Sequence, residues 1–464
     1  MMPATTLALA GVHHAALRRH LFPGDGLEAA AILLCSRVPG PRLRLLAKEV
    51  LPVAYDACAT RTRDAVSWPG ICIERALERG EAETLAVILV HSHPGGMTCF
   101  SEVDDASDRA VIPALFEAYG DIHGSAIMLP GGEMRARLYD ADGTIIEADL
   151  ITAAGDDISF WWRPEDPWKF TPRPTAFTGQ MTDELKRLVA VVIGISGTGS
   201  IQAEQAARLG FRRVILIDFD RVERRNLNRI LNTTLADVLA GRLKVECLAA
   251  SITEYRGLGV AIPVAASITT RDAVLSASQG DVLFCCVDTL EARHIADLIA
   301  AAFLLPLIDV GVSIPVRTTD AGFSIVDAVG RVDYVQPGGS TLGDRAVYSP
   351  DSLRAEYLAR VAPDAYAAEL EAGYIKGAIE EAPAVISLNM RAASAAMNEF
   401  IVRAYPFRLE PNGAYARTLF SLAAGEEDYF AEHSFHAGPN AILGRGASEP
   451  LLGLPVLAAP RSRP

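Results

Sequence analysis

The sequence predicts two α/β domains, the second of them a doubly wound parallel sheet. From about residue 183, an apolar, β-branched run at 188–195 is followed by a helical stretch that ends at Gly210 and by a second apolar run at 212–220. This alternation is typical of parallel strands with helices on both faces of the sheet. Before about residue 155, short apolar runs alternate with turns. A length of 464 residues leaves room for two or three domains at roughly 100–200 residues each.

Composition changes suggest where the domains begin and end. We expect a first domain at 1–155, a linker rich in Pro and Trp at 156–182, the second domain at 183–411 and a loop-rich tail without an assigned fold at 412–464. Stretches rich in Pro that lack a helical or strand period are typical of such connections.

Charge and cysteine content exclude several classes of protein. With 43 basic and 57 acidic side chains the net charge is −14, which argues against a nucleic-acid partner because phosphate binding needs clustered cations. No apolar run reaches the ~20 residues that a bilayer requires, so no membrane partner is expected. The seven cysteines form no CxxC pair, which favours a reducing, cytoplasmic location.

A set of metal-binding side chains follows the apolar run at 85–90. His91 and His93 stand two residues apart, so both imidazoles point to the same side of a strand, and Asp104 follows eleven residues after His93. Two imidazoles and a carboxylate make a three-ligand Zn²⁺ site with a fourth position open for water. Zinc lowers the pKa of bound water to about 7, so the set is typical of hydrolytic enzymes.

Hydrolysis also needs a general base. Glu49, at the end of the apolar run 43–49, is the predicted base, although Glu28 and Glu74 also lie upstream of the histidines. The spacing H-x-H-P, six residues, S-x-x-D, with a Glu upstream, resembles the JAMM (JAB/MPN) metalloprotease motif over roughly 27–140. The resemblance implies an α/β zinc domain that removes ubiquitin-like modifiers from isopeptide or peptide bonds, with Ser101 stabilising the tetrahedral intermediate.

A glycine-rich turn opens the second domain. Gly194, Gly197 and Gly199 follow a buried strand and precede a helix, where their backbone can approach a phosphate at the helix N-terminus. Asp218 ends the next strand, where a carboxylate can hold ribose hydroxyls. On these residues alone a dinucleotide dehydrogenase remains possible.

The residues that follow favour a triphosphate. Polar and cationic side chains gather in one short segment, and further charged residues end or follow later elements: Asp220, Asn226, Asn228, Arg229, Lys244 and Asp288. Such a cluster suits a triphosphate and a carboxylate better than a nicotinamide.

Over about 183–406 these motifs resemble the E1/ThiF/MoeB adenylyltransferases, although Ser196 replaces a glycine of the family's turn. The resemblance implies a Rossmann-like domain that uses ATP and Mg²⁺ to adenylate the C-terminal carboxylate of a ubiquitin-like protein. It implies that Asp218 binds the ribose, that Arg229 and Lys244 bind phosphates, and that Asp288 lies near Mg–ATP and the carboxylate. It also implies a homodimer.

The position of the cysteines bears on transfer of the activated modifier. No cysteine follows Cys286, whereas family members that form a thioester carry a later one. Three routes remain: an oxyester on a loop hydroxyl, for which Ser340 is the first candidate beside Thr341, Ser349 and Ser352; attack by the thiol of an E2-like partner; or release of the adenylate as the product.

The whole chain resembles the E1–deconjugase fusions of bacterial ubiquitin-like (antiphage) operons. The alternatives are a sulfur-carrier activating enzyme with a processing protease, which the missing late cysteine disfavours, and a non-catalytic scaffold that binds nucleotide or modifier.

Overall fold

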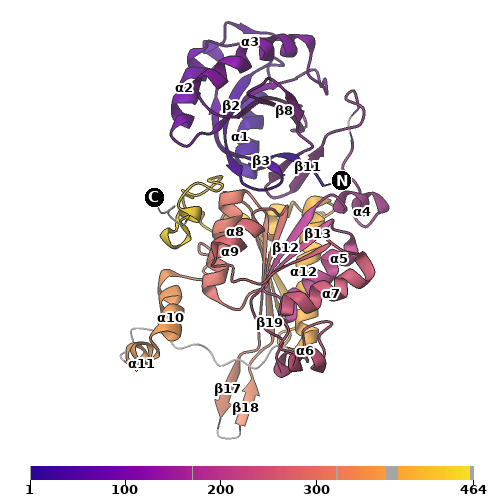
Figure 1. The fold of residues 1–464 in the computed structure, drawn as a ribbon, viewed down its shortest axis with the longest axis vertical. Coiled ribbons are helices and arrows are strands. Elements are labelled where there is room, and N and C mark those ends of the chain that lie inside the picture. Colours follow the sequence, from indigo (N-terminus) through magenta and orange to yellow (C-terminus); the bar gives the residue numbers. More distant parts are fainter. Residues whose placement is uncertain (1, 170, 320–321, 372–384, 460–464) are drawn as a thin grey trace. The chain divides into compact units, whose positions relative to one another are not determined.

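The structure is a computed structural model that describes residues 2–169, 171–319, 322–371 and 385–459. The chain divides into two compact units. The first unit is formed chiefly by Pro3–Arg173 together with the C-terminal segment from Asn440, and the second by Pro174–Ala300 and Leu305–Pro439. Figure 1 shows the course of the chain through both units.

The first unit is built on one nine-stranded mixed sheet with the order β11-β10-β1-β3-β2-β6-β7-β8-β9. Side chains of β2 alternate between two apolar clusters, with Ala31, Leu33 and Cys35 in one and Ile32 and Leu34 in the other. Helix α1 contributes to the first cluster, and α2 and α3 contribute to the second. Helices therefore cover both faces of the sheet, which explains why the sequences of its strands are nearly continuous apolar runs.

The elements of the first unit are β1 (Thr5–Ala10), α1 (Gly11–Leu21), β2 (Ala30–Val38), β3 (Leu43–Pro52), β4 (Thr60–Arg61), β5 (Val66–Ser67), α2 (Ile71–Glu81), β6 (Ala86–Ser92), α3 (Glu102–Ala118), β7 (Ile122–Met128), β8 (Met134–Asp140), β9 (Ile145–Glu147), β10 (Leu150–Ala154) and β11 (Ile158–Trp162).

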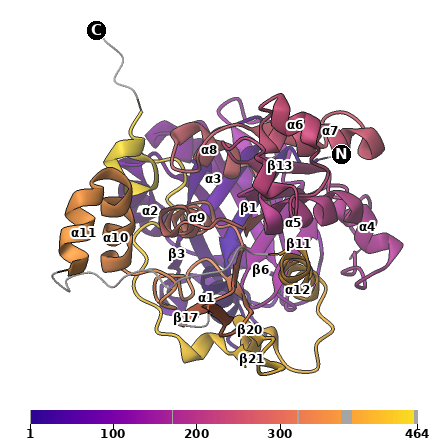
Figure 2. The same ribbon diagram turned by 90° about the horizontal axis from the view of Figure 1, so that it is seen from below.

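The second unit is built on an eight-stranded sheet with the order β14-β13-β12-β15-β16-β19-β20-β21. The strands from β14 to β16 are parallel, and β19, β20 and β21 are added antiparallel. Figures 1 and 2 place α8 and α9 on one face of this sheet and α5 and α12 on the other. The expected doubly wound domain is confirmed, and the connection order reverses between β12 and β15, where such folds bind ligands.

The elements of the second unit are α4 (Gly179–Leu185), β12 (Val189–Ile193), α5 (Gly197–Leu209), β13 (Arg213–Ile217), α6 (Leu235–Leu239), α7 (Lys244–Arg256), β14 (Ala261–Val264), α8 (Arg271–Ala277), β15 (Val282–Cys285), α9 (Leu290–Phe303), β16 (Leu307–Ser313), β17 (Val316–Thr319), β18 (Gly322–Ile325), β19 (Val329–Val335), α10 (Pro350–Val361), α11 (Pro363–Glu371), α12 (Ile386–Ala404), β20 (Arg417–Ser421) and β21 (Glu426–Phe430).

Two of the expected boundaries are wrong. The stretch at 156–182, expected as a linker, begins with β11, which pairs antiparallel with β10 and extends the first sheet. The stretch at 412–464, expected to lack a fold, supplies β20 and β21 to the second sheet. Its later part belongs to the first unit, where the Ser36 hydroxyl donates to the Gly444 carbonyl at 2.6 Å.

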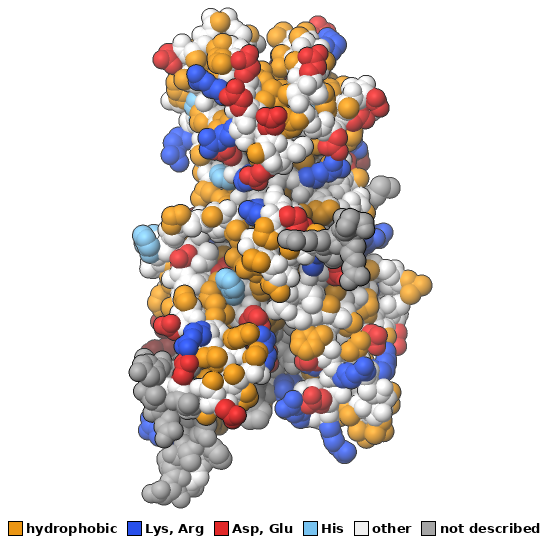
Figure 3. Space-filling view, turned by 60° about the vertical axis from the view of Figure 1, so that its left-hand side comes forward, with side chains coloured by type: hydrophobic (Ala, Val, Ile, Leu, Met, Phe, Trp, Pro, Cys, Tyr) orange, Lys and Arg blue, Asp and Glu red, His pale blue; other side chains and the backbone are white. Residues whose placement is uncertain are grey.

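The surface carries charges of both signs. Acidic and basic side chains are interspersed on the face drawn in Figure 3. Among the described residues, none of the helices combines the length and the apolar character needed to cross a bilayer.

Candidate metal centre and nucleotide site

Three predicted ligands meet at the end of β6. His91 Nε2 lies 3.0 Å from His93 Nε2 and 3.0 Å from Asp104 Oδ1, and His93 Nε2 lies 3.4 Å from Asp104 Oδ2. The histidines come from one strand end, and Asp104 comes from the first turn of α3.

These separations fit Zn²⁺. Two ligands at Zn–N or Zn–O bond lengths of 2.0–2.1 Å and a tetrahedral angle stand about 3.3 Å apart. The three contacts in this cluster lie close to that separation, those to Asp104 being made by its two different oxygens.

Neighbouring groups orient the ligand atoms. His93 Nδ1 lies 2.9 Å from the Met97 carbonyl oxygen, which directs Nε2 towards the other two ligands. Ser101 is the N-cap of α3, and its backbone N–H and its hydroxyl donate to Asp104 Oδ2 at 2.6 and 2.8 Å. Ser101 therefore fixes a ligand carboxylate, a role that the sequence did not suggest.

The cluster is electrostatically coupled. Burial on its own would raise the pKa of Asp104, but hydrogen bonds from His91 and His93 hold this pKa well below its usual range. Burial works against protonation of His93, yet the hydrogen bond to Asp104 raises the pKa of His93 overall. A carboxylate that attracts positive charge this strongly is suited to a cation.

Glu49 is not placed where a base would be needed. It pairs in register with Leu34, whose partner on β6 is Val87, four residues from His91. Four strand residues span about 13 Å, and the Glu49 carboxylate is instead ion-paired with Arg79. The choice of Glu49 as the base is therefore corrected, and Glu74 lies exposed on α2.

Glu28 lies beside the cluster. Ala30 pairs with His91, and the Ser92 N–H donates to the Ala29 carbonyl at 3.0 Å, so the next position, Glu28, is opposite His93. Burial raises the pKa of Glu28 to about 7, opposed by the charge of His93 and reinforced by that of Asp104. The sequence could not separate Glu28 from Glu49, because that requires the strand register.

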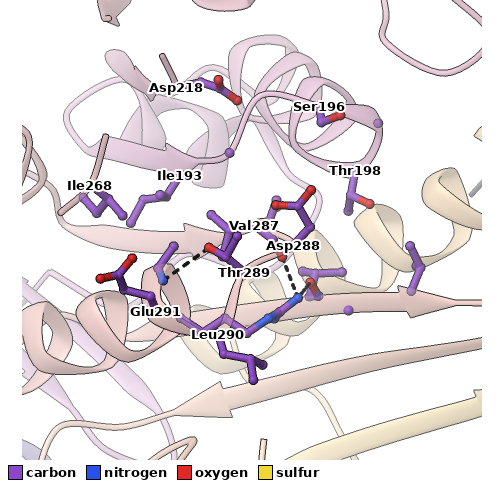
Figure 4. A pocket seen from close by; sticks show the side chains of 18 of the residues that line it. Ile193, Ser196, Thr198, Asp218, Ile268, Val287, Asp288, Thr289, Leu290 and Glu291 are labelled. Atoms are coloured by element: carbon purple, nitrogen blue, oxygen red, sulfur yellow. Dashed lines mark hydrogen bonds between the residues drawn. The ribbon is translucent and has the colours of Figure 1, made fainter. Parts of the chain in front are cut away.

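The second unit contains a cavity of about 770 Å³ at the point where the strand order reverses. Figure 4 shows part of its lining, with Asp288 pointing into the space between the loop after β15 and the start of α5. Seven of the predicted residues line it: Gly194, Gly197, Asp218, Asp220, Arg229, Lys244 and Asp288.

The other three predicted residues do not line the cavity. A Cβ at Gly199 would lie 1.7 Å from the Gly194 carbonyl oxygen, so this glycine allows the turn to close. Asn226 is buried in a capping box with Glu223. Asn228 is exposed and accepts a hydrogen bond from Arg229 at 3.1 Å. The assignment of Asn226 to the binding surface is corrected, because its side chain is committed to this capping box. The roles of Gly199 and Asn228 stay predictions.

Asp218 organises the glycine turn. Its two carboxylate oxygens accept from the Ile195 N–H at 2.7 Å and from the Asp220 N–H at 2.8 Å. Burial raises the pKa of Asp218, partly offset by the charge of Lys244. Lys244 itself is buried and donates to Asp220 Oδ2 at 2.7 Å. A cation and two carboxylates thus converge on one side of the cavity.

Several lining residues could not be predicted from local motifs. Asn389 comes from α12, is 1% exposed, and would lie 2.1 Å from a Cβ at Gly197. Arg293 holds the loop that carries Asp288, because it donates to the Val287 carbonyl at 2.6 Å and pairs with Asp309. Arg331 and Arg417 line the far end of the cavity. No short-range signal connects these residues to the glycine turn.

Ser340 is not an accessible nucleophile. It is 0% exposed, its hydroxyl accepts from Arg345 Nε at 2.9 Å, and its N–H donates to Glu432 at 2.7 Å. The prediction that Ser340 accepts the activated modifier is therefore corrected by its burial. Cys286 lines the cavity, but burial raises the pKa of its thiol far above the neutral range.

The three alternative hydroxyls also have local partners. Thr341 donates to Asp344 at 2.8 Å, and Ser349 and Ser352 form the capping box at the start of α10.

Comparison with known proteins assigns both units. Residues 11–139 match the prokaryotic homologues of the JAB domain, and residues 173–326 match the ThiF family. Ubiquitin-like modifier-activating enzyme 5 of Bombyx mori is 30% identical over 122 residues, which cover 24% of this chain and 30% of that protein. The tRNA threonylcarbamoyladenosine dehydratase of Bacillus subtilis (strain 168) is 35% identical over 86 residues, 18% of this chain and 33% of that protein. The chain thus spans about a third of the length of these relatives.

Among solved structures, E. coli MccB with ATP aligns with a TM-score of 0.41 at 17% identity, covering 57% of this chain and 68% of that chain. MccB in complex with N-formylated MccA aligns with a TM-score of 0.42 at 18% identity, over 56% and 69% of the two chains. From the two family matches, the chain carries a JAB domain in its N-terminal part, followed by a ThiF, E1-like domain.

Proposed function

We propose that the ThiF-like unit adenylates the C-terminal carboxylate of a ubiquitin-like protein and that the JAB-like unit hydrolyses bonds made by the same modifier. The observation that supports the proposed adenylation is the continuous cavity in the second unit. It holds the glycine turn, Lys244 and Arg229 at one end, continues over β16 and β19, and has Asp288 between the two ends.

The nucleotide end supplies the groups that a triphosphate needs. The turn at Gly194–Gly197 brings backbone close to a phosphate at the N-terminus of α5, where the helix dipole favours negative charge. Arg229 and Lys244 provide positive charge for the phosphates, and Asp218 provides a carboxylate for the ribose hydroxyls. Asp288 is exposed at the cavity wall and can hold Mg²⁺ against phosphate oxygens.

The other end suits the end of a peptide chain. Its lining includes Arg331 of β19 and Arg417 of β20, whose positive charge favours a terminal carboxylate. In the reaction, a carboxylate oxygen attacks the α-phosphorus, an acyl–AMP anhydride forms, and pyrophosphate leaves.

The JAB-like unit is proposed to hold Zn²⁺ through His91, His93 and Asp104. Bound zinc supplies a polarised water at neutral pH. Glu28 takes the proton of the attacking water and returns it to the leaving nitrogen. Ser101 keeps the Asp104 carboxylate in the position that the cation requires.

The acceptor of the adenylate is proposed to be a thiol of another protein, as in an E2-like partner. In this chain no cysteine follows Cys286, and the cavity's own thiol is protonated by burial. The relatives named as ubiquitin-like modifier-activating enzymes support the modifier class. We further propose a cytoplasmic location, supported by the free cysteines, and a homodimer, by the resemblance to the E1/ThiF/MoeB adenylyltransferases.

Pyrophosphate exchange tests the adenylation. With ATP, Mg²⁺ and a candidate modifier, the full chain should exchange labelled pyrophosphate into ATP, and Asp288→Ala should lower the rate by at least about 100-fold. Asp272→Ala, which changes an acidic residue in the first turn of α8 outside the cavity lining, is the matched control. Exchange that persists in Asp288→Ala would refute the role of Asp288.

A further inference from the structure

The segment 163–169, called the strap below, begins at Arg163, which pairs with Asp149, and is fastened further along by two other side chains. Arg135 donates to the Pro167 carbonyl at 2.8 Å and to the Lys169 carbonyl at 3.2 Å. The Thr98 hydroxyl donates to the same Pro167 carbonyl at 2.8 Å. Three donors are thus directed at main-chain oxygens of a peptide segment.

Both fastening residues belong to the surroundings of the metal centre. His91 pairs with Ile127 on β7, and Ile127 pairs with Arg135 on β8, so the three side chains form a row on one face of the sheet. Two strand spacings put Arg135 about 10 Å from His91, the length of about three extended residues. Thr98 lies in the loop that joins His93 to Ser101.

The contacts that fasten the strap are polar, and only Pro164 and Asp166 of its side chains are half-buried. None of the side chains at 163–169 is buried, and Trp168 is 72% exposed. Asp166 closes the turn, because its carboxylate accepts from the Trp168 N–H at 3.1 Å and pairs with Lys169 at 3.0 Å. Displacing the strap would expose little apolar surface and would free the donors of Arg135 and Thr98.

A second arginine of β8, two residues from Arg135, has different partners. Arg137 lies on the same face of β8, is buried, and is fully engaged with Asp105, Asp108 and the ring of Phe100. Arg137 therefore fixes α3 to the sheet. Among the described residues, Arg135 donates its hydrogen bonds to carbonyls of the strap, with the charges of Cys99 and Glu147 near it, and these carbonyls can be exchanged for others.

We propose that Arg135 and Thr98 form a subsite for main-chain carbonyls of an extended peptide, about three residues from the bond that is cleaved, and that the strap fills this subsite in the free protein. The inference rests on the proposed hydrolysis. Donors that bind main-chain oxygens tolerate many side chains, so the subsite recognises an extended backbone. Carbonyl groups of a substrate tail replace those of the strap as the acceptors of Arg135 and Thr98.

Binding measurements test the subsite. The full chain, loaded with zinc and carrying Glu28→Gln to prevent turnover, is titrated against fluorescein-labelled Ala-Leu-Ala-Gly-Gly and Gly-Gly by fluorescence anisotropy. Replacing 164–169 by alternating Gly and Ser should tighten binding of the pentapeptide at least about tenfold and leave the dipeptide unchanged. Zinc content and Tm should stay at the values of the intact strap, because no buried side chain is removed.

Arg135→Met in the strap-replaced chain should abolish the tenfold gain. Arg37→Met, which removes an exposed arginine paired with Asp121 in the same unit, should keep it. The proposal is overturned if strap replacement leaves the affinity for the pentapeptide unchanged, or if Arg135→Met retains the gain.

A kinetic measurement separates the proposed subsite from the proposed hydrolysis. Both peptides are offered as coumarin amides to the strap-replaced chain with Glu28 intact. Binding of the pentapeptide that depends on Arg135, without hydrolysis of either amide, supports the subsite and contradicts the proposed hydrolysis. Hydrolysis that is equal for both peptides and independent of Arg135 contradicts the subsite and supports the hydrolysis.

Discussion

Replacing Glu28 by glutamine should have opposite effects on catalysis and on stability. The carboxyl is buried opposite His93, and its pKa is raised from 4.5 to about 7 by that burial. Glutamine keeps the size and polarity of the side chain but can neither accept the proton from water nor carry the charge. The change therefore removes a base and also removes a buried charge.

The size of the stability effect follows from the pKa. Because the folded chain holds this proton more tightly than the unfolded chain, the carboxyl destabilises the fold as the pH rises from 4.5 through about 7. The shift of about 2.5 units corresponds to about 3 kcal/mol at pH 8.5 and to less than about 1 kcal/mol at pH 5. Glu28→Gln should raise the unfolding free energy of the zinc-free protein by those amounts.

Urea unfolding at the two pH values, followed by tryptophan fluorescence, measures this difference in the first unit, because all four tryptophans lie there. Hydrolysis by the zinc-loaded protein should fall by about 10²–10⁴, the usual contribution of a general base. Glu49→Gln is the matched control, since it breaks only a partly exposed pair with Arg79, worth about 0–1 kcal/mol, and should leave hydrolysis unchanged. Full hydrolysis by Glu28→Gln, or its loss in Glu49→Gln, would refute the assignment.

Three further substitutions separate binding from packing. Ser101→Ala should weaken zinc affinity about 10–100-fold in a chelator competition, because Asp104 loses the hydroxyl that orients it; unchanged affinity would contradict this. Gly199→Ala should abolish ATP binding in calorimetry, because its Cβ would overlap the Gly194 carbonyl oxygen, whereas Gly179→Ala, with open space around it, should bind normally. Ser340→Ala should retain pyrophosphate exchange and transfer of the modifier while costing about 1–2 kcal/mol in urea unfolding, since it removes one buried hydrogen bond; loss of transfer with a stable fold would restore Ser340 as the acceptor.

The parts of the fold that local patterns could predict are those built from contiguous elements. The run β12–α5–β13 and the metal ligands at the end of β6 each lie within a few tens of residues. Their spacing in the sequence is therefore enough to predict them. Glu28 could not be separated from Glu49, because the distinction depends on which residues of β2 and β3 face His91 and His93.

Long-range pairing explains the remaining errors. β20 and β21 have no strand partner nearby in sequence except each other, and they are strands because β19 offers a free edge. The burial of Ser340 depends on Arg345 and Glu432, the latter 92 residues away. Neither contact can be recognised from the residues that neighbour Ser340 in the sequence.

Because the segment from Asn440 belongs to the first unit, it affects how proteolysis separates the two units. Apart from the short piece Ala301–Leu304, which also belongs to the first unit, the backbone passes between the two units near residues 173 and 439. A protease that cuts only the earlier connection leaves both halves joined through the later one. A fragment that stops at Arg173 lacks the Gly444 carbonyl that Ser36 donates to. Limited digestion should therefore release the two units separately only after a second cut, and the order of synthesis delays completion of the first unit until the second has emerged.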